Sequence, residues 1–72
     1  MTTTAGTETL AARVARIRAR KRLSLRQVAA AGGLSHVAVG EIERGIRATH
    51  KLDTLQALAK GLGVSLALLV KP

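Results

Sequence analysis

Most of the ionisable side chains in this sequence are the cations Lys and Arg. Lys and Arg together number 12, against 4 Asp and Glu, which gives a formal net charge of +8 on 72 residues. A charge of this size creates a strong positive field and favours phosphate backbones, since their counterions are released on binding. The sequence therefore predicts a polyanionic partner. Solubility alone is the other explanation for the charge, although acidic residues would serve it at least as well.

Catalytic and metal chemistry find little support among the remaining side chains. His36 and His50 are the only histidines, there is no cysteine, and no carboxylate pair shares a convincing helical face with either histidine. A protein metal site needs more ligands than this. Ser24 and Ser35 stand at helix starts, where serine acts as an N-cap, and no histidine is placed to activate them as nucleophiles. We expect no enzymatic activity, no metal and no cofactor.

The absence of aromatic residues narrows the class of polyanion. The chain has no Phe, Tyr or Trp, the side chains on which bases of single strands usually stack. Double-stranded nucleic acid is therefore the better expectation. The lack of cysteine fits a reducing compartment, the N-terminus has no signal-peptide pattern, and the longest apolar stretch, Leu66 to Val70, is too short to cross a bilayer. We expect a cytoplasmic protein without a membrane anchor.

Helical periodicity runs through the chain after a Thr-rich segment, residues 1–7, which we expect to be a flexible tail. The length allows one domain, over residues 8–72. A first helix is expected from Glu8 to Lys21. Its buried stripe consists of Leu10, Val14 and Ile17, and its basic flank of Arg13, Arg16 and Arg20.

Two short helices joined by a tight turn are expected next. A capping-box pattern begins the first helix, paired glycines end it, and a serine caps the second helix, which another glycine ends. Small Ala29 lies where the two axes would cross. The first of these helices is expected to start at Leu25, after the capping box of Ser24 and Gln27, and to end at Gly32 and Gly33. The second is expected from His36 to Arg44, with Ser35 as its N-cap and Gly45 at its end.

Two further helices complete an all-α fold of five helices without strands. The fourth helix has an apolar face, and two glycines end it; the fifth is a single turn capped by a serine. The fourth helix is expected from Leu52 to Lys60, before Gly61 and Gly63, and its apolar face consists of Leu52, Leu55, Leu58 and Ala59. The fifth is expected from Leu66 to Leu69, after Ser65.

Three segments, LSLRQVA, GLS and EIERG, give the chain its resemblance to a known family. The sequence resembles the Cro/repressor-type (XRE family) helix-turn-helix transcriptional regulators, from about Leu10 to Leu69. The resemblance implies a compact, five-helix, lambda-repressor-like DNA-binding domain in which the third helix enters the major groove. It also implies a sequence-specific regulator of transcription, expected to be a repressor.

The resemblance assigns base reading to the third helix, at His36, Val37 and Glu41. Val37 could contact a thymine methyl group, Glu41 could accept from a cytosine amino group, and His36 could donate to a purine or a phosphate. This set departs from the Gln, Arg, Ser or Asn common in the family, which lowers the expected sequence specificity. Gly40 lies on the same predicted outer face and belongs to the predicted base-reading set. In mid-helix it costs about 1 kcal/mol relative to Ala, which indicates either close approach to a backbone or an accident of sequence.

Contacts to phosphate are expected around the start of the second helix and after the third. The first-turn amides of the second helix can accept an anion, and Arg26 stands in the same turn. The resemblance adds the loop that follows the third helix. Leu25 departs from the family, which commonly has Gln there, so that Arg26 or Gln27 would substitute. The full predicted set is Arg22, Ser24, Arg26, Gln27, Arg44, Arg47 and Lys51.

Two structural roles complete the expectations. The resemblance pairs Arg18 with Glu43 in a partly buried salt bridge that fixes the first helix against the third. It also implies a homodimer whose two recognition helices lie about 34 Å apart. The apolar C-terminal run is the candidate interface, with core packing as the alternative; its residues are Leu66, Leu68, Leu69 and Val70.

Two other functions are compatible with the same residues. A protein-interaction module, such as an antitoxin or anti-repressor, would use the apolar segment from His36 to Gly40 against a protein groove. A sequence-tolerant DNA-coating protein would rely on charge alone. Salt dependence and competition with random DNA distinguish these functions from operator binding.

Overall fold

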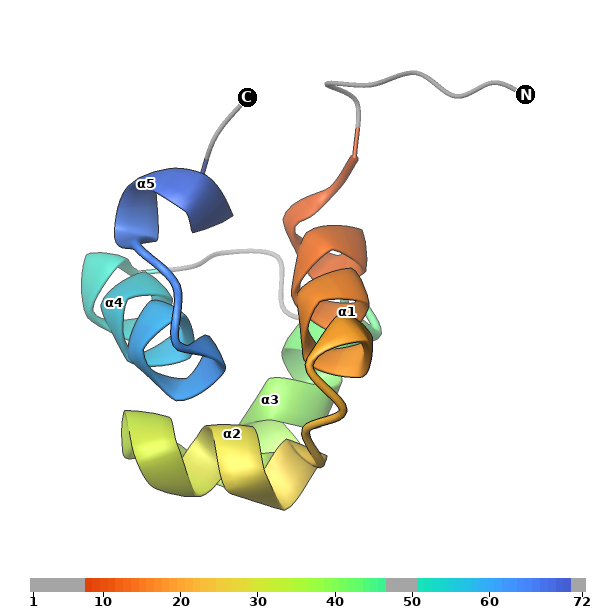
Figure 1. Cartoon of the computed structure of the whole chain (residues 1–72), viewed down its shortest axis with the longest axis vertical. Helices are drawn as coiled ribbons and strands as arrows, with labels where there is room; N and C mark the ends of the chain where they lie inside the picture. The colour runs from red at the N-terminus through yellow and green to blue at the C-terminus, as the bar shows by residue number, and fades with distance from the viewer. Residues whose placement is uncertain (1–7, 47–50, 71–72) are drawn as a thin grey trace.

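The computed structural model describes residues 8–46 and 51–70, and its regular structure there is entirely helical (Figure 1). The all-α, five-helix expectation is therefore confirmed. The expected tail, residues 1–7, lies outside the described residues, so its flexibility and the domain boundary at residue 8 stay predictions. The helices are α1 (Leu10–Arg20), α2 (Leu25–Gly32), α3 (His36–Glu43), α4 (Leu52–Leu62) and α5 (Leu66–Leu69).

Side-chain caps fix where most of the helices begin. The Ser24 hydroxyl accepts from the Gln27 amide at 3.0 Å, and the Ser24 amide donates to Gln27 Oε1 at 2.7 Å, which completes the capping box. Ser35 and Ser65 cap α3 and α5 in the predicted positions. α1 begins two residues later than expected, at Leu10, because the Thr9 hydroxyl accepts from the backbone of its first turn.

The turn between α2 and α3 is made by Gly33, whose φ of +76° lies in the left-handed region that glycine adopts freely. The Leu34 amide then donates to the Ala29 carbonyl at 2.8 Å and closes the turn. Ala29 is itself buried in the core. The small residues thus produce the short helix pair that their spacing predicts.

Aliphatic side chains from all five helices meet in one core, without any aromatic residue. Leu69 of α5 belongs to this core and has no exposed surface. Its predicted place in a dimer interface is therefore wrong, because the last helix turns this side chain inward. The fully buried side chains are Val14, Val28, Val39, Ile42, Leu58 and Leu69, with Leu62 only 1% exposed.

Backbone contact at two glycines joins α2 to α4. A Cβ added to Gly61 would overlap the Val28 carbonyl oxygen, and one added to Gly32 would overlap the Ala57 carbonyl oxygen. Gly61 was expected to end the fourth helix, and this prediction is wrong: α4 continues to Leu62. The glycine serves close approach between helices, and the turn comes at Gly63, whose φ is +72°.

Arg13 of α1 and Lys21, the residue that follows α1, hydrogen-bond the C-terminal ends of α5 and α4. Lys21 Nζ donates to the carbonyl oxygens of Leu62 at 2.8 Å and Gly63 at 3.2 Å, and Arg13 Nη1 donates to the Leu69 carbonyl at 3.0 Å. Cations are favourable at helix C-termini because of the carbonyl groups left there without partners. Arg13 is 9% exposed, so its predicted place on a basic flank is wrong.

Candidate nucleic-acid interface

The helix pair α2 and α3 lies at one end of the fold, with α5 at the other (Figure 1). α2 rests on α4, and α3 rests on α1 and α2. Both helices of the turn are therefore supported from behind by longer helices. A partner that binds the outer sides of α2 and α3 therefore contacts helices that the rest of the fold holds in place.

α3 divides into an exposed first turn and a largely buried remainder. His36 is exposed and Val37 is 56% exposed, whereas Val39 and Ile42 are fully buried. Glu41 is half-buried. The structure thus places all three predicted base-reading side chains at least partly at the surface, with the two at the start of the helix most accessible.

Gly40 does not lie on the outer face, and that prediction is wrong. Gly40 is buried, and an added Cβ would lie 3.3 Å from Nη1 of Arg44 and 3.6 Å from Cδ1 of Leu25. A helical wheel treats α3 alone, whereas in the fold the side chain of Arg44 and a residue of α2 cover this glycine. Gly40 therefore leaves room for Arg44, and protein atoms cover the face that was expected to meet a base.

The structure contains the ion pair between Arg18 of α1 and Glu43 of α3 that the family resemblance implies. Arg18 Nε donates to Glu43 Oε2 at 2.5 Å and Nη2 donates to Oε1 at 3.0 Å, while Nη1 donates to the Leu23 carbonyl at 2.8 Å. Their side chains are 25% and 11% exposed. Hydrogen bonding of the guanidinium to Glu43 raises the pKa of Arg18 above its usual value. One guanidinium thus ties α3 to α1 and to the turn before α2.

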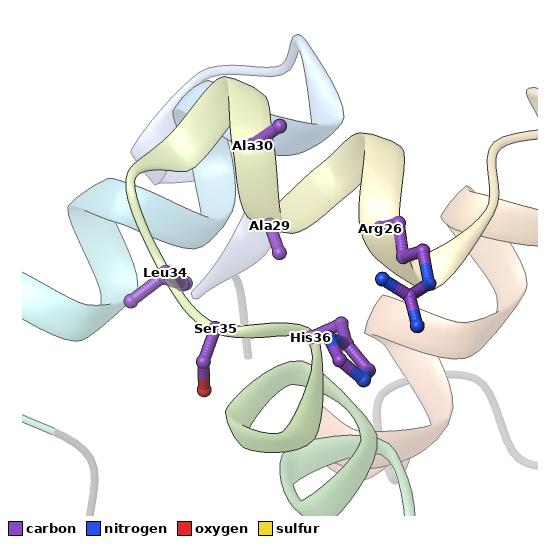
Figure 2. Close-up of a pocket in the computed structure, with 6 residues that line it drawn as sticks. All are labelled: Arg26, Ala29, Ala30, Leu34, Ser35 and His36. Atoms are coloured by element: carbon purple, nitrogen blue, oxygen red, sulfur yellow. The ribbon is translucent and has the colours of Figure 1, made fainter.

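A shallow groove of about 320 Å³ runs between α2 and the start of α3 (Figure 2). Arg26 on the α2 side and His36 at the first position of α3 extend into the same space, as Figure 2 shows. Apart from these two residues the lining is small or apolar: Ala29, Ala30, Leu34 and Ser35. The Ser35 hydroxyl already accepts from the Ala38 amide at 3.0 Å.

The predicted phosphate-binding residues fall into two groups. The first surrounds the start of α2, where all four side chains are exposed. Within it Ser24 and Gln27 are already hydrogen-bonded to each other, which gives them a structural role as well. In the second group Arg44 and Lys51 are exposed, and Arg47 lies outside the described residues. The first group consists of Arg22, Ser24, Arg26 and Gln27.

Arg22 has a backbone feature that the sequence analysis missed. Its φ is +58°, and it is the one residue other than glycine with positive φ in the described ranges 8–46 and 51–70. Its amide donates to the Ala19 carbonyl at 3.0 Å as the chain leaves α1. A short connection between two helices, without glycine or asparagine to turn it, was the only signal that could have revealed this.

Other kinds of site find no support in the described part of the chain. Across residues 8–46 and 51–70, no three His, Cys, Asp or Glu side chains come together as metal ligands would. Nor does any helix described there have the length and apolar character needed to pass through a bilayer.

A pair of short helices whose second helix exposes its first turn, with basic residues around it and an aliphatic core behind it, defines a helix-turn-helix DNA-binding domain. A family model described as helix-turn-helix matches residues 14–69, from α1 into α5. The chain belongs to the XRE-type helix-turn-helix family of DNA-binding regulators. No curated protein sequence matches the chain.

Proposed function

We propose that this protein is a sequence-specific repressor of transcription that inserts α3 into the major groove of double-stranded DNA. The observation that carries the proposal is the exposed first turn of α3, with exposed Arg22 and Arg26 before it in the chain and exposed Arg44 after it. A DNA-reading helix with cations on both sides suits the major groove of DNA, because that groove lies between two phosphate backbones. Repression is the proposed direction because a small domain blocks a promoter simply by occupying it.

Base reading in this proposal rests on the start of α3. Val37 contacts a thymine methyl group, and Glu41 accepts a hydrogen bond from a cytosine amino group. His36 stands at the same turn and is exposed toward the groove with α2. With so few donors in the set, we expect moderate discrimination between operator and random DNA.

Phosphate contacts supply most of the affinity. The cations proposed for these contacts are Arg22 and Arg26 around the start of α2, and Arg44, Arg47 and Lys51, which follow α3 in the sequence. Ser24 and Gln27 add neutral donors at the start of α2. Each contact releases counterions, so binding should weaken steeply with salt.

We propose a homodimer that brings two copies of α3 to successive turns of DNA. Leu68 and Val70 are each 47% exposed at the C-terminal end, and Leu66 is half-buried against the core. Large apolar side chains at a surface mark an interaction site when they are grouped. With Leu69 in the core, Leu68 and Val70 are the main candidates for the interface.

The protein-interaction alternative loses much of its proposed surface. It relied on a continuous apolar face from His36 to Gly40, but Val39 and Gly40 are buried and Ala38 is half-buried. Val37 is the large apolar side chain that this segment exposes. An isolated exposed apolar side chain is ordinary on a protein surface.

The proposal is tested by selecting genomic fragments with the purified protein at physiological salt, with random competitor DNA in excess, and sequencing what is bound. Recurrent inverted repeats with half-sites about one helical turn apart would support a dimeric, sequence-specific regulator. A flat profile with binding retained at low salt would contradict sequence-specific regulation and favour the DNA-coating function.

A further inference from the structure

The groove between α2 and α3 brings an arginine and a histidine side chain into one space. Arg26 and His36 extend into it from different helices, and the other residues of the lining carry no charge (Figure 2). The hydroxyl of Ser35 is already engaged as a helix cap. The space is open to solvent from the outer side of the helix pair, where DNA would lie under the proposed function.

We propose that Arg26 and His36 together bind a single DNA backbone phosphate, with the imidazole of His36 in its protonated form. This inference rests on the proposed function, because it requires that α2 and α3 face DNA. It assigns His36 to the phosphate backbone instead of to a base edge. It also means that DNA binding takes up a proton.

Charges on the neighbouring elements favour an anion at this position. α2 has no acidic residue, and its charged side chain is Arg26. On α3, Glu41 stands five residues after His36, about 7.5 Å further along the axis. Glu43 lies further on and is paired with Arg18 of α1. The imidazole therefore faces a cation across the groove, and a phosphate between the two would relieve their repulsion and hydrogen-bond to both.

Proton uptake gives this arrangement a measurable dependence on pH. Imidazole gains its proton within the range of pH 5 to 8, roughly, so affinity should rise as pH falls through that range. Because Arg26 and His36 share one phosphate, no further phosphate is neutralised on protonation, and the slope of log affinity against log salt should change little with pH. The pH effect belongs to the phosphate backbone, so it should appear on DNA of any sequence.

The experiment measures the affinity of the full chain for a labelled, mixed-sequence duplex by fluorescence anisotropy, at fixed salt and across that pH range. For the wild type we expect roughly tenfold tighter binding at the acidic end. His36→Gln keeps a hydrogen-bond donor but cannot titrate, and should remove most of this gain. His50→Gln is the matched control, because it removes the other histidine of the chain and should keep the gain.

Two further variants test whether the two side chains share one phosphate. His36→Arg keeps a positive charge at every pH of the series, so its binding should be tight and almost independent of pH. Arg26→Met should weaken binding and also reduce the pH-dependent gain, since His36 would then hold the phosphate alone. Arg26 and His36 are exposed, and circular dichroism checks that each variant is folded.

Failure of this inference differs from failure of the proposed function. Wild-type binding that does not change with pH, or a pH effect that survives in His36→Gln, would overturn the shared phosphate site while leaving DNA binding in place. An unchanged pH effect in Arg26→Met would also overturn it. No binding to duplex DNA at any pH, even at low salt, would contradict the proposed function itself.

Discussion

Gly61 of α4 lies against the carbonyl oxygen of Val28 in α2 with no room for a side chain between them. The Gly32 and Ala57 backbones repeat the arrangement on the same pair of helices, with the glycine now on α2. α2 is therefore seated on α4 by direct backbone contact at two points. Because α3 follows α2 through a tight turn, this contact between α2 and α4 also fixes the position of α3, the proposed DNA-reading helix.

Replacing Gly61 by Ala should destabilise the fold. The new methyl group must push α2 away from α4, and overpacking of this kind costs about 1 to 3 kcal/mol or more. Gly40→Ala is the matched control, because its neighbour is the flexible end of Arg44 and the helix gains up to about 1 kcal/mol from Ala. Thermal unfolding followed by far-ultraviolet circular dichroism should show the two melting temperatures moving in opposite directions. A Gly61→Ala variant as stable as the wild type would contradict the close approach.

Glu43→Gln should lower stability by about 3 kcal/mol, because the Arg18 guanidinium would be left partly buried without its counter-charge. Arg18→Lys should have an intermediate effect, since an ammonium group keeps the charge but cannot supply the parallel pair of donors. Chemical denaturation of the three proteins measures the difference. An unchanged midpoint in Glu43→Gln would mean that the pair does not hold α3 to α1.

Arg22→Gly should stabilise the protein and weaken its binding to DNA. Glycine relieves a left-handed backbone conformation that costs an arginine about 1 kcal/mol, but the cation is lost from the edge of α2. Arg22→Ala separates the two effects, because it removes the charge and keeps the Cβ. Both variants should lose affinity and reduce the salt slope by about 1, while the melting temperature rises in the glycine variant alone. Unchanged affinity in both would remove Arg22 from the interface.

The ion pairs of Glu8 make part of the stability dependent on pH. Hydrogen bonding from Arg16, with a further contribution from Arg13, lowers the pKa of Glu8 below 4.5. A carboxyl whose pKa is lower in the folded state stabilises the fold above its unfolded pKa, and this contribution disappears as pH falls through the folded value. Glu8→Gln should therefore melt below the wild type at neutral pH and approach it in acid. A constant difference across the pH series would contradict this account, and added salt should shrink the difference at neutral pH.

Local signals in the sequence were sufficient for the helices and the turn. The capping box of Ser24 and Gln27, the Ser35 cap and the left-handed Gly33 involve residues that are close together in the sequence. A sequence pattern is therefore sufficient to predict them. Gly61 shows where such patterns fail. A glycine near a helix end predicts termination, and only the position of Val28 in three dimensions reveals that this one serves contact between helices.

The same limit applies to the candidate site. The exposure of His36 and Val37 follows from helical periodicity, whereas the burial of Gly40 depends on α2 and on the folded-back side chain of Arg44. Arg13 and Lys21 are cations of the kind that bind DNA phosphates, but in the structure they donate hydrogen bonds to backbone carbonyls at the ends of α5 and α4. Net charge counts such cations without showing which of them face inward.

The most direct test of the central claim is an amide-resolved NMR titration of the labelled protein with a duplex recovered from the genomic selection. If α3 reads DNA, the largest shifts should fall on the start of α2, around Arg22 and Arg26, and on the first turn of α3 at His36 and Val37. The amides of α5 should change little unless dimerisation accompanies binding. Shifts concentrated on α4 and α5, with α3 unaffected, would contradict the proposal that α3 reads DNA.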